Sequence, residues 1–170
     1  MENVRQFALL SIAVVAVLRD LREGRIPNRL IVIGLVCGAV WQFAAAGQAG
    51  LVLFAGGCVL PVLLFGGLYY FRMFGAGDIK LLCVLGGFLG PMDGFRCIVV
   101  SVFLGGCIAL AILMAGGGLR ERLGYLAGYL FEYAADGQWR SYMAGARRQD
   151  RFCFSVPVLL GVLCYIGGFL

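Results

Sequence analysis

Long apolar runs separated by short polar or glycine-containing stretches dominate the chain. Six of them stand at about residues 6–18, 30–46, 51–71, 79–92, 97–117 and 153–170. Apolar runs of roughly 17 to 25 residues are long enough to cross a bilayer as α-helices. The pattern therefore predicts an all-α, polytopic membrane protein with about six transmembrane helices, in which residues 1–170 form one membrane-embedded domain.

The composition agrees with this pattern. Of the 170 residues, 62% are hydrophobic and 14% are charged, whereas about a quarter of the residues of a soluble domain are charged. A secretory signal peptide is the alternative interpretation of the first run. It fits poorly, because no small-residue cleavage site follows the run in "VAVLRDLREG".

Basic residues occupy every second loop. Apart from Arg5 and Arg96, each lysine and arginine falls between the first and second runs, the third and fourth, or the fifth and sixth. Because Lys and Arg favour the cytoplasmic side, we expect these three loops in the cytoplasm and both termini outside. Positive-inside bias and contact with anionic lipid account for the net charge of +5 without a nucleic-acid partner.

The last charged loop, at about 118–152, is predicted to contain an amphipathic helix. Its leucines recur three and four residues apart, at Leu119, Leu123, Leu126 and Leu130, which is a helical spacing. Such a helix would lie in the membrane interface or against the bundle. A plain surface helix is the simpler interpretation, and a role in substrate docking is the alternative.

Glycine and cysteine bear on packing and on excluded chemistry. The stretches "GLVCG" (34–38) and "GGFLG" (86–90) have the GxxxG spacing that lets membrane helices approach closely. Histidine is absent, and the seven cysteines form no CxxC pair. Zinc fingers, HExxH metallopeptidases and His-dependent Ser or Cys catalysis are therefore excluded. We expect no metal and no cofactor.

Two of the nine acidic residues, Asp20 and Asp78, stand at the expected cytoplasmic lip of an apolar run with further patterning around them. Carboxylates held close together cannot both ionise easily, so such a pair shares a proton. One can then take a proton from water while the other polarises a carbonyl, which is what aspartyl peptide hydrolysis requires. The simpler interpretations are an N-cap role for Asp78 and a loop ion pair of Asp20 with Arg19 or Arg22.

The residues flanking the two aspartates argue against these simpler interpretations. Pro27 and Asn28 supply a fixed turn and a capping residue before the second run. Gly75 and Gly77 let the backbone before Asp78 pass close to another chain. A helix cap alone requires neither feature.

The expected helix ends also bear on which aspartate holds the shared proton. Asp78 should begin a helix and Asp20 should end one. The positive potential at a helix N-terminus therefore favours an ionised Asp78, and the negative potential at a C-terminus favours a protonated Asp20. The arginines near Asp20 act in the opposite direction but are screened by water.

Two stretches, "DLREGRIPNRL" (20–30) and "GAGDIKLLCVLGGFLG" (75–90), resemble the type IV prepilin peptidase family, including its preflagellin peptidase relatives. These are GxGD membrane aspartyl proteases, whose pattern of Asp, proline turn and GxGDxK falls here on Asp20, Pro27–Asn28 and Gly75–Lys80. The stretch "FSVPVLLGVL" (154–163) is similar to the proline-bearing final segment of the family. The N-terminal insert with paired CxxC motifs, linked to N-methylation in larger members, is missing, so methyltransferase activity is not expected.

The resemblance implies an aspartyl endopeptidase of the cytoplasmic membrane with Asp20 and Asp78 as the catalytic pair, water as nucleophile and no cofactor. Its implied substrate is a prepilin-like or preflagellin-like protein with a short basic leader and a hydrophobic stem, cut on the cytoplasmic side. Lys80 is a motif residue without an assigned role. The alternative is a small proton-coupled transporter that uses the two lip aspartates, and a structural assembly subunit comes third. The oligomeric state is left open.

Overall fold

The computed structural model describes residues 2–70, 74–115, 124, 128 and 153–169, and helices are the only regular secondary structure among them. These helices are α1 (Glu2–Glu23), α2 (Asn28–Tyr70), α3 (Ala76–Leu89), α4 (Pro91–Ala115) and α6 (Ser155–Ile166). The predicted all-α fold is confirmed for this part of the chain. The amphipathic helix predicted within 118–152 lies outside the described residues, apart from Gly124 and Gly128.

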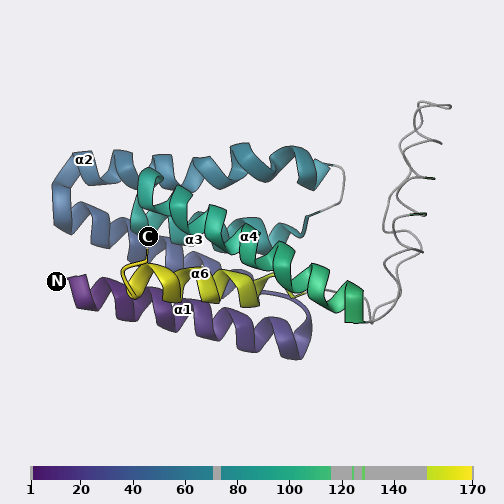
Figure 1. Ribbon diagram of the computed structural model, residues 1–170. Helices are drawn as coiled ribbons and strands as arrows, with labels where there is room; N and C mark the ends of the chain where they lie inside the picture. Colours follow the sequence, from purple (N-terminus) through teal and green to yellow (C-terminus); the bar gives the residue numbers. More distant parts are fainter. Residues whose placement is uncertain (1, 71–73, 116–123, 125–127, 129–152, 170) are drawn as a thin grey trace.

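α2 is a helical hairpin. Ala46 (φ −141°) and Gly47 (φ 57°) leave the helical conformation, and the chain reverses its direction within α2 (Figure 1). Gly47 supplies a positive φ that residues with a side chain rarely adopt. The reversal falls between the second and third apolar runs, where the hydrophobic pattern predicted a loop.

The hydrophobic pattern predicted the boundary between the fourth and fifth apolar runs at residues 93–96, which is later in the sequence than the observed boundary between α3 and α4. Gly90 takes φ 81° directly after α3, and Pro91 begins α4. Proline suits the first position of a helix because an N–H there has no partner within the helix. Asp93 and Arg96 therefore lie in the first turns of α4 and not in a loop.

The helices run alternately in opposite directions, and the two chain termini lie at one end of the bundle (Figure 1). The turn within α2 and the turn between α3 and α4 lie at that same end. The loop after α1, the start of α3 and the start of α6 lie at the other end. Segments far apart in sequence thus meet at each end of the bundle.

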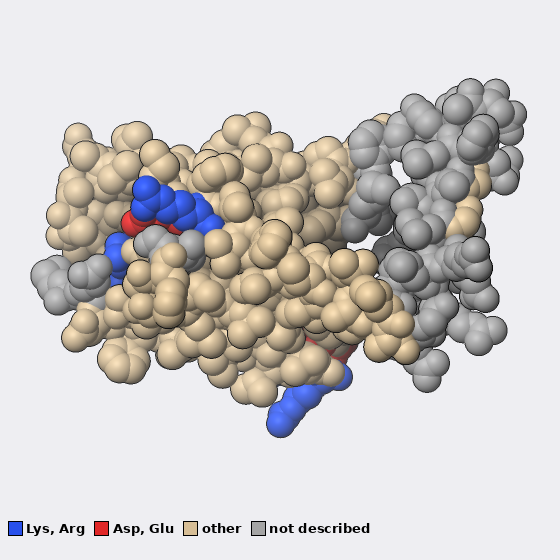
Figure 2. Space-filling model, in the orientation of Figure 1, with Lys and Arg blue, Asp and Glu red and all other residues tan. Residues whose placement is uncertain are grey.

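Charged side chains of the described residues cover a small part of the face drawn in Figure 2. On the face drawn in Figure 2 they form two groups, one toward each end of the bundle, with a broad uncharged surface between them. By length and hydropathy, two of the described helices are candidate membrane spans, Asn28–Tyr70 and Pro91–Ile112, and Ser155–Ile166 is a shorter apolar helix. This distribution is what helices in contact with lipid require, because charge is costly within a bilayer.

α3 is the most deeply buried helix. It packs against both halves of α2 and also contacts α1, α4 and α6. Its side chains at Leu81, Leu82, Val84, Leu85 and Phe88 are 0% or 1% exposed. Because neighbours surround α3 on every side, the position of its first turn is determined by the whole bundle.

Glycines allow α2 and α3 to approach each other closely. A Cβ on Gly57 would lie 1.9 Å from the main-chain oxygen of Gly86, and a Cβ on Gly34 would lie 2.6 Å from Cγ1 of Val84. The predicted packing role of the GxxxG glycines is therefore confirmed for Gly34 and Gly86. Gly90, the last glycine of "GGFLG", forms the turn before α4 instead.

Replacing Gly57 by alanine is expected to destabilise the fold. The added methyl group meets a backbone carbonyl, so α2 and α3 must separate, and overpacking of this kind costs about 1–3 kcal/mol or more. Gly66→Ala is the matched control on the same half of α2, because a Cβ there meets nothing within 4 Å and alanine favours a helix. Thermal unfolding in detergent measures both, and equal Tm values would contradict the close contact.

Candidate active site

Asp20 lies in the last turn of α1. The N–H of Gly24 donates to the main-chain oxygen of Asp20 at 2.8 Å, and Gly24 takes φ 61°, a left-handed conformation that commonly ends a helix. The carboxylate of Asp20 accepts a hydrogen bond of 2.6 Å from Oγ of Ser155. Arg19 pairs with Glu23, so the simple ion pair between Arg19 and Asp20 is not the arrangement observed.

Asp78 lies within the first turn of α3. Gly75, and not Asp78, occupies the N-cap position of α3, and no side-chain hydrogen bond caps this end of the helix. The simple interpretation of Asp78 as an N-cap residue is therefore wrong. A Cβ on Gly75 would lie 2.7 Å from Oδ2 of Asp78. Glycine at this position therefore leaves the space that the Asp78 carboxylate occupies.

The two carboxylates line one cavity of about 580 Å³. The last turn of α1, the loop from α1 to α2 and the first turn of α3 form its wall. Every residue that the sequence analysis assigned to the site lines this cavity: Asp20, Pro27, Asn28, Gly75, Gly77, Asp78 and Lys80. The fold thus brings two motifs that are distant in sequence to the same end of the bundle.

A hydrogen bond links these two motifs directly. Nζ of Lys80 donates to Oδ1 of Asn28 at 2.9 Å, across 52 residues of sequence. Asn28 was predicted to cap α2, but it is the first residue of that helix, and the main-chain oxygen of Pro27 accepts from the N–H of Leu30. Lys80 therefore has a structural partner in the first motif, which its position in the sequence did not indicate.

The environment of Asp78 favours its protonated form. Asp78 precedes the apolar run at 79–92 and faces the cavity. Burial, followed by the charge of Asp20, raises the pKa of Asp78 from 3.8 to about 6. The helix dipole favours an ionised Asp78, and the cost of desolvating the charge acts in the opposite direction. Which of the two aspartates holds the shared proton stays a prediction.

Aromatic packing holds the start of α3 against the start of α6. The ring of Phe74 stacks on that of Phe65 with centroids 5.0 Å apart. The same ring meets Phe154 edge to face at 4.9 Å. Since Phe74 directly precedes Gly75 and Phe154 directly precedes Ser155, the cluster holds the backbone before the first turn of α3 together with the backbone before Ser155, the partner of Asp20.

The sequence analysis missed the contribution of α6 to this site. Ser155 is completely buried against Asp20, and Cys153 lies close enough to both aspartates for its thiol to interact with each charge. Ser155 lies in the stretch 154–163, which was noted only for its proline, and Cys153 directly precedes that stretch. A serine at the start of an otherwise apolar helix was the available signal, because serine near a helix N-terminus is commonly a hydrogen-bonding residue.

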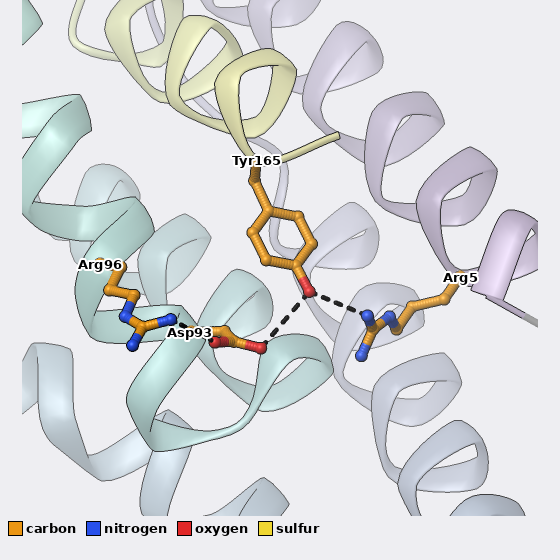
Figure 3. A network of polar contacts seen from close by, with 4 residues as sticks. All are labelled: Arg5, Asp93, Arg96 and Tyr165. Atoms are coloured by element: carbon orange, nitrogen blue, oxygen red, sulfur yellow. Dashed lines mark hydrogen bonds and ion pairs between the residues drawn. The ribbon is translucent and has the colours of Figure 1, made fainter. Parts of the chain in front are cut away.

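A different polar network occupies the opposite end of the bundle (Figure 3). The hydroxyl of Tyr165 accepts from Nη2 of Arg5 at 2.8 Å and donates to Oδ2 of Asp93 at 3.4 Å. Arg96 pairs with Asp93 at 3.6 Å. The network joins α1, α4 and α6, and it places Asp93 away from the cavity that Asp20 and Asp78 line.

A family model, the Type IV leader peptidase family, matches residues 7–113, which is more than half of the chain and includes both cavity aspartates. The chain belongs to this family. Neither the curated proteins nor the solved structures contain a match to it. Membership makes the protein a leader peptidase, hence a hydrolase, and its apolar helices together with the family indicate a membrane protein.

The described residues contain no group of three or more His, Cys, Asp or Glu side chains that could hold a metal ion.

Gly75→Ala is expected to reduce peptidase activity far more than stability. The new Cβ displaces the flexible end of the Asp78 side chain, which costs little folding energy. If Asp78 reacts with the substrate, a misplacement of its carboxylate by about 1 Å can cost roughly 100-fold in rate. Gly66→Ala is the control, because Gly66 lies on α2 outside the cavity and a Cβ there would meet nothing within 4 Å. Peptide cleavage and thermal unfolding measured together test this, and equal activity losses in the two variants would contradict it.

Asp78→Asn is expected to stabilise the protein at neutral and alkaline pH. Because the pKa of Asp78 rises from 3.8 to about 6 on folding, the folded chain binds more protons than the unfolded chain between these values, so its stability falls as the pH rises through that window. Asparagine does not ionise and avoids this loss, about 1–3 kcal/mol. Thermal unfolding should show a higher Tm for the variant at about pH 8 and little difference at about pH 4. A lower Tm at the higher pH would contradict the raised pKa.

Proposed function

We propose that this protein is an aspartyl endopeptidase that removes the short basic leader of prepilin-like or preflagellin-like proteins at the cytoplasmic face of the cell membrane. The cavity shared by Asp20 and Asp78 carries the proposal. The coupling between their charges is the second support, because it is what a proton-sharing pair requires. The family supplies leader peptidase activity in general, and the carboxylate pair supplies the aspartyl mechanism.

The different surroundings of Asp20 and Asp78 support different roles for the two carboxylates in the proposed mechanism. Asp78, whose pKa is raised, holds the proton and donates it to the oxygen of the scissile carbonyl. Asp20 accepts the hydroxyl hydrogen bond of Ser155 and, in its ionised form, takes a proton from the attacking water. The water oxygen then bonds to the carbonyl carbon. When the C–N bond breaks, the proton on Asp20 passes to the leaving nitrogen, and a hydroxyl proton of the tetrahedral intermediate returns to Asp78.

A second cavity supports the placement of a hydrophobic substrate stem. Its volume is about 470 Å³, and apolar side chains and two cysteines of α2 and α3 form its wall. Lys80 lines both this groove and the cavity of the two aspartates. A stem lying in the groove beside α2 and α3 would therefore present the peptide bond that precedes it to the catalytic pair.

The charge distribution supports the proposed orientation of a multi-pass protein. The loop between α1 and α2, which carries Arg25, lies at the cavity end of the bundle, and Lys80 lines the cavity itself. The opposite end carries Arg5 and Arg96, both in contact with the Tyr165–Asp93 network. Under the positive-inside rule the cavity faces the cytoplasm and the termini face outward. A basic leader would then approach Asp20, Glu23 and Asp78, which are acidic residues of the cavity wall.

Asp20→Asn and Asp78→Asn should each reduce cleavage of a leader-bearing peptide by about 100- to 10,000-fold, because each removes a proton-transfer group. Asp93→Asn is the matched control at the opposite end of the bundle and should retain activity. Purified protein in detergent with a peptide that carries the leader and part of the stem provides the assay.

The same assay separates this proposal from its alternatives. A proton-coupled transporter or a structural subunit would leave the peptide intact even with the unaltered chain. An inactive Asp93→Asn variant beside an active Asp20→Asn variant would show that the catalytic pair is wrongly assigned.

A further inference from the structure

The first turn of α6 contributes a hydrogen bond to Asp20 from outside the residues that match the family. The matched range ends at residue 113, whereas Ser155 is the first residue of α6. Oγ of Ser155 lies 2.6 Å from Oδ2 of Asp20, and Ser155 is 0% exposed. A buried hydroxyl that donates to a carboxylate at this distance makes a charge-assisted hydrogen bond, which is stronger than one between neutral groups.

We propose that Ser155 is a positioning residue for Asp20, and that its hydroxyl orients the carboxylate in the cavity and favours its ionised form. The inference rests on the proposed function, in which ionised Asp20 takes the proton from water. In this proposal, α6 contributes a side chain to the site as well as completing the helical bundle.

Packing around Ser155 fixes the direction of its hydroxyl. Phe154 occupies the N-cap position of α6 and makes no side-chain cap bond. Its ring is held between Phe74 and α4, where a Cβ on Gly105 would lie 3.1 Å from Cε2 of Phe154. The neighbouring Pro157 is also fully buried. With the backbone held on both sides, the side chain of Ser155 is preorganised toward Asp20 and does not have to be ordered when a substrate binds.

The charges around Asp20 show why such a donor is needed. Asp78 on α3 carries a like charge in the same cavity, and two ionised carboxylates there repel each other. The other titratable or charged groups that line the cavity or interact with Asp20 are Glu23, Arg25, Lys80 and the Cys153 thiol. The Ser155 hydroxyl is a neutral donor in direct contact with Asp20, and the positive end of the α6 dipole lies beside it. Both favour negative charge on Asp20.

The decisive measurement is the pH dependence of kcat/KM for Ser155→Ala. Loss of a hydrogen bond to a charged group should lower kcat/KM by about 10- to 100-fold. Its acid limb should move to higher pH by about one unit, because the pair loses a donor that favours its ionised form. Ser155→Thr keeps a hydroxyl and should restore most of the activity and the position of the limb.

Ser101→Ala is the matched control for a purely structural role. Ser101 is also 0% exposed, its Oγ donates to the main-chain oxygen of Cys97 at 2.7 Å, and it faces α6 at Gly161. This variant removes a buried hydroxyl from the α4–α6 contact without touching Asp20, so its pH profile should match that of the unaltered protein. A Ser155→Ala profile with no shift of the acid limb, whatever its height, would overturn the inference.

A measurement without substrate separates failure of this inference from failure of the proposed function. Infrared titration of the carboxyl band in the full-length protein should show a higher midpoint in Ser155→Ala than in the unaltered chain, and no change in Ser101→Ala. An unchanged midpoint overturns the role of Ser155 even if Asp20→Asn is inactive. If the midpoint shifts in Ser155→Ala but the unaltered protein cleaves no leader peptide, the role of the Ser155 hydrogen bond is supported and the peptidase mechanism is rejected.

Discussion

Two carboxylates that share one cavity repel each other when both are ionised, and the rest of the bundle holds Asp20 and Asp78 together against that repulsion. Asp78 is held by α3, which is buried among all the other described helices. Asp20 is held by the last turn of α1 and by the hydroxyl of Ser155. Burial of Asp78, followed by the charge of Asp20, raises the pKa of Asp78 to about 6, which is the cost of this arrangement. Conflict between folding stability and local charge is typical of functional sites.

The depth at which α3 is buried depends on glycine. Gly57 and Gly86 meet backbone to backbone, with no room for a Cβ on either, so α3 can enter the space beside the α2 hairpin. Close contacts of this kind bind helices together where lipid removes the hydrophobic driving force between them. Because the scaffold around α3 is rigid, the first turn of α3 presents Asp78 in one place, and the missing side chain at Gly75 leaves space for its carboxylate.

α6 is anchored at both of its ends. At its start, Ser155 contacts Asp20 and Phe154 packs against Phe74. At its other end, the hydroxyl of Tyr165 joins Arg5 to Asp93. The two anchors, at opposite ends of the bundle, determine where α6 lies along α1. The network of Arg5, Tyr165 and Asp93 has no assigned role in the proposed chemistry. Because it anchors the far end of α6, it helps to keep Ser155 opposite Asp20.

Local sequence determined much of this protein. Apolar runs and glycine breaks located the helices and the turn at Gly47, because helix length and positive φ are properties of a short segment. The two motifs identified the aspartates and the residues next to them, because the spacing of motif residues along the sequence does not depend on the fold. Only the tertiary structure decided that Lys80 bonds to Asn28, that Ser155 bonds to Asp20 and that burial raises the pKa of Asp78. Contacts between helices depend on which faces meet, and a pKa depends on how much water the fold removes; neither is encoded within a single segment.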